Sequence, residues 1–178
     1  WVLKKMNEFL QGNFTKFVFW LRHFTGNKWA YFLTRGKQSM GSIEVDDQVL
    51  GLSVLTHEPW ADLERVGVFG HSYGGYMSLM CLCQAGKHFK AGVAVAPVAD
   101  WQLYDSHYTE RFMGLPDKDA EAYAASSVIP HLPKLERPLL LMHGMADDNV
   151  LFIHSTMLMS ELQKLGKPFE LMTYPGAK

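Results

Sequence analysis

One serine in this sequence stands in a setting that favours nucleophilic chemistry. Ser72 is the central residue of Gly70-His-Ser-Tyr-Gly74, which fits the pattern G-x-S-x-G. A serine in this pattern is exposed on a sharp turn when a buried strand precedes it and a helix follows. The two flanking glycines must then be small, because strand and helix nearly collide, and the Tyr73 backbone N–H would face the oxyanion of an acyl-transfer intermediate. The alternative is a glycine-rich turn with an incidental serine.

Two neighbouring carboxylates later in the chain are candidates for the acid of such a site. Asp147 and Asp148 come shortly after an apolar run at 138–143, at the place where the acid follows the serine in folds with this turn. We interpret Asp147 as the acid and keep Asp148 as the alternative. Asp and Asn also cap helices, and this reading suits Asp148 and Asn149 in particular.

The base that would accept the serine proton is harder to place. The chain order Ser, acid, His predicts a histidine after the apolar run at 169–174, where the chain reads Pro175-Gly-Ala-Lys178. Of the eight histidines only His154 follows Asp147, and we expect it on the surface of a helix. His71 is expected to point away from Ser72. We therefore expect that this polypeptide by itself lacks its general base and is inactive.

The elements that position these residues alternate along the chain. Short apolar runs predict strands, and amphipathic stretches predict helices between them. This alternation is typical of a parallel sheet with helices on both faces, an α/β fold. The predicted strands are 65–69, 91–96, 138–143 and 169–174, and the predicted helices are 43–56, 76–85, 119–127 and 153–165.

Composition restricts the classes of protein to consider. The chain has 178 residues, of which 48% are hydrophobic and 20% charged, as in an ordinary globular domain. A net charge of −1 gives no reason to expect nucleic acid or an anionic membrane as a partner. No apolar run is long enough to span a membrane. Cys81 and Cys83 are interpreted as small buried residues rather than a disulfide or a zinc site.

Residues 1–40 differ from the rest of the chain. They hold ten of the 23 aromatic residues and seven Lys or Arg against one acid, Glu8. The segment could be a linker, a partner-binding region, the boundary of an upstream domain or aberrant non-native sequence, and we favour the last two. We expect residues 41–178 to form a separate but partial α/β domain.

Several longer motifs carry a family resemblance. They include Glu44-Val-Asp-Asp-Gln48, Tyr104 to Pro116 with its Tyr-Thr-Glu-Arg core, and His143-Gly-Met-Ala-Asp-Asp-Asn-Val150. With the Ser72 turn, they make residues 41–178 resemble the hydrolase domain of the prolyl oligopeptidase family, in its dipeptidyl peptidase IV branch. The resemblance implies an α/β-hydrolase fold, a peptide substrate and no metal or organic cofactor. It also implies an upstream β-propeller and, in many members, a homodimer.

The resemblance also implies roles for single residues. Ser72 would be the nucleophile, Asp147 the acid, and the Tyr73 backbone one oxyanion donor, with the catalytic histidine directly after Lys178. Asn149 would bind a substrate carbonyl. Aromatic rings suit the flat apolar side chain of proline, and the pocket for the residue before the scissile bond would be lined by Tyr73, Val98, Trp101, Tyr104, Tyr108 and Val150.

Together these features favour a serine peptidase that releases N-terminal dipeptides with proline or alanine in second position. Another peptidase of the family, an acylaminoacyl peptidase or an oligopeptidase, is the alternative, and a carboxylesterase is a further one. The alternative from a different class of protein is a non-catalytic interaction domain, which acts by binding partners and catalyses no reaction. The sequence favours no cellular compartment.

Overall fold

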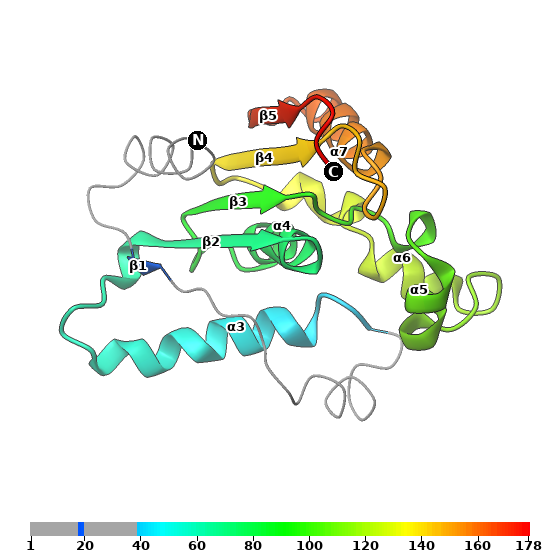
Figure 1. Ribbon diagram of the computed structural model, residues 1–178. Helices are drawn as coiled ribbons and strands as arrows, with labels where there is room; N and C mark the ends of the chain where they lie inside the picture. Colours follow the sequence, from blue (N-terminus) through cyan, green and yellow to red (C-terminus); the bar gives the residue numbers. More distant parts are fainter. Residues whose placement is uncertain (1–17, 20–38) are drawn as a thin grey trace.

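A parallel sheet forms the centre of the molecule (Figure 1). The computed structural model describes residues 18–19 and 39–178. The order of the strands in the sheet follows their order in the chain, and every neighbouring pair is parallel. The strands are β1 Val18–Phe19, β2 Val66–His71, β3 Ala91–Val95, β4 Leu139–Gly144 and β5 Glu170–Tyr174.

Helical segments connect the strands. The predicted strands and helices are all present, with ends that shift by at most three residues. The helix α5, the 3₁₀ segments η2, η3 and η4, and the short strand β1 were not predicted from the sequence. The α-helices are α3 Ile43–Val54, α4 Tyr73–Gln84, α5 Ser106–Met113, α6 Ala120–Ser126 and α7 Ile153–Lys164; the 3₁₀ segments are η1 Leu55–His57, η2 Leu63–Arg65, η3 Trp101–Leu103 and η4 Ile129–Lys134.

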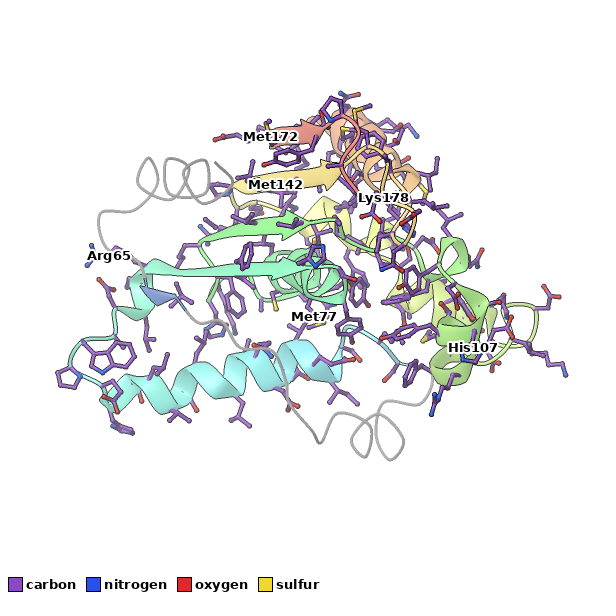
Figure 2. All side chains as sticks on the ribbon, in the orientation of Figure 1. Arg65, Met77, His107, Met142, Met172 and Lys178 are labelled. Atoms are coloured by element: carbon purple, nitrogen blue, oxygen red, sulfur yellow. The ribbon has the colours of Figure 1, made fainter. Side chains whose placement is uncertain are left out.

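The main core lies between one face of the sheet and these helices. Alternate strand residues such as Ala94 and Leu141 pack there against α4 and α7. The intervening residues, Val93 and Met142 among them, form a second cluster on the opposite face. Met142 pairs with Met172 of the neighbouring strand, and both are labelled in Figure 2. The alternation follows from the two-residue repeat of a strand.

The described helices contribute to the first face only. Within 18–19 and 39–178, no helix residue belongs to the second cluster. This placement follows from the strand order. When strands are added to a parallel sheet in chain order, the right-handed crossovers all run the same way and place every connecting helix on the same face. The α/β architecture is as predicted, whereas helices on the second face stay a prediction.

Two remaining expectations concern the cysteines and the N-terminal segment. Cys81 and Cys83 are buried in α4 and unbridged, as predicted, and burial raises the pKa of each thiol to about 12. The interpretation of residues 1–40 falls almost wholly outside the described residues and stays a prediction. Among the residues that are described, no helix is long and apolar enough to cross a membrane.

Candidate active site

Ser72 occupies the sharp corner between β2 and α4. Its backbone has φ 59° and ψ −120°, a conformation that costs a non-glycine residue about 1–3 kcal/mol. The Ser72 N–H donates to the Val95 carbonyl at 2.9 Å, and the Ser72 carbonyl accepts from the Tyr76 N–H at 3.0 Å. These bonds tie the corner to β3 and to the first turn of α4. Ser72 is therefore held, partly exposed, at the carboxyl edge of the sheet.

The glycines at this corner differ in how much space surrounds them. A Cβ at Gly70 would lie 2.1 Å from the Gly74 carbonyl oxygen, and one at Gly75 would lie 2.7 Å from the Val95 oxygen. Close packing therefore requires both glycines. At Gly74 an added Cβ would meet nothing within 4 Å in the described structure. The expectation that both flanking glycines must be small holds for Gly70 and is wrong for Gly74.

Asp147 lies in the turn after β4, at the same edge of the sheet. Its Oδ1 accepts the backbone N–H groups of Asn149 at 2.9 Å and Val150 at 3.0 Å. The side chain is 12% exposed. Two strand spacings, about 10 Å, separate the ends of β2 and β4. This separation is too long for a direct hydrogen bond between Ser72 and Asp147, whereas an imidazole ring between the two side chains fits.

His143 is the buried residue beneath the Asp147 turn. Its Nε2 lies 2.8 Å from the Val150 carbonyl oxygen and 3.4 Å from Asp147 Oδ2. A carbonyl only accepts, so Nε2 carries a proton, and Nδ1 lies 2.7 Å from the Ser155 hydroxyl. Both ring nitrogens are thus engaged. His143 supports the turn and has no nitrogen left for Ser72.

The aromatic residues predicted for the pocket form one cluster. The ring centroid of Trp101 lies 5.8 Å from Tyr73, 5.8 Å from Tyr104 and 6.0 Å from Tyr108. Trp101 and Tyr104 follow β3 closely, as the sequence indicated, whereas Tyr108 comes from α5 and Tyr73 from α4. Segments far apart in the chain thus meet at this edge of the sheet.

Exposure divides the predicted pocket residues into two groups. Val98, Trp101 and Val150 are each 1% exposed, so in this structure they form the back of the cluster. Tyr73, Tyr104 and Tyr108 are partly exposed, and Asn149 is exposed. The Tyr104 hydroxyl donates to Asn149 Oδ1 at 3.1 Å. This bond occupies the amide oxygen and leaves the amide N–H groups of Asn149 to donate.

The histidines differ from expectation at one position. His154 was expected on the surface, but it is fully buried at the start of α7. Its Nδ1 accepts the Ala99 N–H at 3.1 Å, because the first turn of α7 packs against the segment after β3. Burial, followed by the nearby His143, lowers its pKa to about 4. In the described part of the chain no histidine hydrogen-bonds Ser72.

The last residues return to the Asp147 turn. The Ala146 N–H donates to the Ala177 carbonyl at 3.0 Å, and Lys178 Nζ pairs with Asp148 Oδ2 at 2.5 Å. Lys178 accordingly lies beside this turn in Figure 2. The last residues thus lie at the carboxyl edge of the sheet, beside the Asp147 turn.

Sequence reasoning missed Glu44 as part of this region. Glu44 Oε1 accepts a hydrogen bond from the Tyr73 hydroxyl at 2.8 Å, although 29 residues separate them. Glu44 stood in the motif Glu44-Val-Asp-Asp-Gln48, which carried the resemblance but gave it no role. Its other signal was an acid in the first turn of a helix, which the helix dipole explains equally well. Spacing along the chain does not predict such a contact.

Apart from the Ser72 corner, two other kinds of site come into question, a metal centre and a cavity. Within the described ranges, no cluster of three His, Cys, Asp or Glu side chains could hold a metal. A cavity of about 540 Å³ lies among residues 135–139 and 167–170. That cavity is at the amino ends of β4 and β5, the opposite edge from Ser72.

This fold and corner define an α/β-hydrolase, and comparisons with known proteins make the class more specific. Residues 17–178 match the prolyl oligopeptidase family, and the chain belongs to that family. Mouse dipeptidyl peptidase 8 is 47% identical over 143 residues, which are 78% of this chain and 16% of the relative. The mouse protein named inactive dipeptidyl peptidase 10 is 42% identical over 137 residues, 76% of this chain and 17% of its own length.

Solved structures agree with this assignment. The crystal structure of Porphyromonas gingivalis dipeptidyl peptidase 4 matches with a TM-score of 0.75 and 41% identity. The match covers 79% of this chain and 20% of that structure. The chain thus spans about a fifth or less of the length of these relatives.

Proposed function

We propose that this chain contributes the nucleophile, the acid and the substrate pocket of a serine peptidase that releases N-terminal dipeptides. The observation that carries the proposal is the left-handed backbone of Ser72 at the β2–α4 corner, at the same sheet edge as Asp147. A strained corner of this kind persists where the surrounding structure enforces it, as it does at nucleophile turns. Membership of a peptidase family supports the same chemistry.

Ser72 Oγ would attack the scissile carbonyl carbon while its proton passes to a histidine imidazole. We expect this histidine directly after Lys178, since the chain there lies against the Asp147 turn. Asp147 would orient the imidazole and stabilise its cation. The Tyr73 N–H would donate to the oxyanion. The tetrahedral intermediate expels the amine, which takes the proton from the imidazole, and water then cleaves the acyl-enzyme by the same steps.

The aromatic cluster would receive the residue before the scissile bond. Its partly exposed rings are Tyr73, Tyr104 and Tyr108. Fully buried Trp101 backs them. Flat rings bury a proline side chain well and leave little room for longer flexible ones, so proline or alanine would be preferred. Asn149 would donate its amide N–H to a substrate carbonyl while Tyr104 holds the amide oxygen.

The test is hydrolysis of a Gly-Pro-chromophore substrate by the full-length protein. We expect turnover, and we expect Ser72→Ala to reduce kcat by roughly 10⁶-fold, as in a well-studied serine protease. His71→Ala is the matched control, because it changes an exposed residue beside Ser72. Undiminished turnover in Ser72→Ala would exclude the mechanism.

Release of dipeptides needs a separate check. We propose that acidic residues of an upstream β-propeller bind the free amino terminus of the substrate, and that the protein forms a homodimer. An N-acetylated Gly-Pro substrate should then be cleaved at least a hundredfold more slowly than the free one. Equal rates would favour an acylaminoacyl peptidase or an oligopeptidase, and preference for simple esters a carboxylesterase.

A non-catalytic interaction domain is the candidate from another class. One similar protein is named inactive dipeptidyl peptidase 10, so high similarity alone does not imply activity. Ser72 and Asp147, each held in a defined turn, favour the enzyme. A full-length protein that is folded but hydrolyses no peptide substrate would favour the interaction domain.

A further inference from the structure

Glu44 connects α3 to the residue that follows the candidate nucleophile. The Tyr73 hydroxyl donates to its Oε1 at 2.8 Å, and the Gly41 backbone N–H donates to its Oε2 at 2.9 Å. Both carboxylate oxygens therefore have a donor inside the protein. The carboxylate is partly buried, and hydrogen bonds to a charged group are about twice as strong as neutral ones.

The segment that carries Glu44 is itself fixed. The Gly41 carbonyl accepts from Gln84 Nε2 of α4 at 2.9 Å, and the Met40 N–H donates to Ser126 Oγ at 3.2 Å. A Cβ at Gly41, where φ is +81°, would lie 2.1 Å from the Tyr76 hydroxyl oxygen. Gly41 is thus packed directly against α4. These contacts leave Glu44 little freedom to follow a moving Tyr73 ring, so it acts as an anchor.

Tyr73 joins two features of the proposed chemistry. Its backbone N–H is the candidate oxyanion donor, and its ring packs against Trp101 and Tyr76 at centroid distances of 5.8 and 5.6 Å. Burial and then the Glu44 charge raise the pKa of Tyr73, so its hydroxyl stays protonated and donates throughout the neutral range. A bond at the far end of the ring therefore fixes both the ring and its backbone.

We propose that Glu44 is a positioning residue that, through the Tyr73 hydroxyl, sets the aromatic wall contacting the residue before the scissile bond. This inference rests on the proposed function and adds a determinant of its selectivity. Without the anchor the Tyr73 ring gains rotational freedom, and the wall loses its fit to proline more than its fit to smaller alanine. Glu44 itself touches no reacting atom.

The test measures kcat/KM of the full-length protein for matched Gly-Pro and Gly-Ala substrates. Loss of a charge-assisted hydrogen bond predicts that Glu44→Ala lowers kcat/KM for Gly-Pro by about 10- to 100-fold. The effect on Gly-Ala should be at least threefold smaller, so the ratio of the two changes. Glu44→Gln should fall between, because an amide has one acceptor oxygen for two donors. A loss of folded protein alone would lower both rates equally.

Two controls isolate the Tyr73 contact. Asp46→Asn removes an exposed acid from the same first turn of α3 and should leave the selectivity ratio unchanged. Tyr73→Phe keeps the ring and removes its hydroxyl, so it should reproduce Glu44→Ala. The double variant should be no worse than the poorer single one, since both remove the same bond.

The outcomes separate this inference from the proposed function. An unchanged selectivity ratio in Glu44→Ala, or full additivity in the double variant, would overturn the inference while Ser72 chemistry stands. A wild-type protein that cleaves neither substrate would overturn the proposed function and this inference with it.

Discussion

At the scale of single residues, the environment of Asp147 explains how one carboxylate could be held for catalysis. Two backbone N–H groups occupy Oδ1, and Oδ2 lies 3.4 Å from His143 Nε2 beneath it. The orientation of the carboxylate is therefore built into the turn after β4 before any imidazole arrives. Neighbouring Asp148 is exposed and pairs with Lys178, whose hydrogen bond lowers the pKa of Asp148.

Asp147→Asn should lower kcat by about 10⁴-fold while the protein stays folded. An amide oxygen can still accept the two N–H groups, but the amide cannot hold the imidazole in the required tautomer; the magnitude is that of the equivalent change in a serine protease. Steady-state kinetics of the full-length protein and its melting temperature measure the two effects. Asp148→Asn is the matched control and should keep nearly all activity, so an equal loss in both variants would contradict the assignment.

The sequence favours Asp147 over Asp148 through its position and the family resemblance, but it contains no contact that separates the two. Both acids follow the same strand, and either could cap the next segment. Their difference in burial depends on the turn conformation and on His143, four residues earlier. The burial of His154 was missed for a similar reason, since its partner Ala99 lies 55 residues away. Contacts between distant segments of the chain cannot be predicted from the spacing of residues within one stretch of sequence.

At the scale of secondary-structure elements, the β2–α4 corner shows what local pattern can predict. An apolar run, a glycine-rich turn and a helical stretch predicted strand, corner and helix in the right order. The helix begins at Tyr73, three residues before the predicted start at Tyr76. Gly74 and Gly75 are poor helix formers, so the prediction left them in the preceding turn, but they lie in the first turn of the helix. The helix α5 was missed because it has only eight residues, mostly polar, and its N-cap Asp105 is apparent only from the bond to the Tyr108 N–H.

The glycines at this corner give a stability prediction. Gly70→Ala should destabilise the protein by about 3 kcal/mol or more, because its Cβ would lie 2.1 Å from the Gly74 oxygen and β2 and α4 would have to separate. Gly74→Ala should be neutral or stabilising by up to about 1 kcal/mol, as helix propensity favours alanine. Chemical unfolding of both variants measures this difference. Equal destabilisation would mean that the corner is packed differently.

At the scale of the whole molecule, buried His154 makes stability depend on pH. Burial lowers its pKa from 6.5 to about 4, so the unfolded chain takes up a proton that the folded chain excludes. This contribution is complete above pH 6.5 and declines as the pH falls toward 4. Linkage predicts a loss of about 2 kcal/mol between pH 7.5 and pH 5.

His154→Gln should remove this dependence. The comparison is the urea midpoint of the wild-type and variant proteins at pH 7.5 and pH 5. The wild type should lose more stability than the variant over this interval, although it is more stable at pH 7.5. Parallel losses in the two proteins would show that other groups dominate the acid sensitivity.

Some large-scale features of the fold cannot be predicted from the sequence, because they depend on the order of the strands in the sheet. Alternating strands and helices predicted an α/β sheet, and the parallel strand order agrees. The pattern does not say which helices share a face, because that depends on strand order rather than on any one element. The placement of Glu44 beside Tyr73 is a product of the same assembly, as α3 packs on α4.

The central claim, that Ser72 is the nucleophile, is tested most directly by locating a covalent adduct. The full-length protein is treated with a fluorophosphonate, digested and sequenced by mass spectrometry. We predict one phosphonyl group per chain, on the Oγ of Ser72, and none on Ser72→Ala. An active protein whose label lies on another residue, with the Ser72 peptide unmodified, would contradict the account.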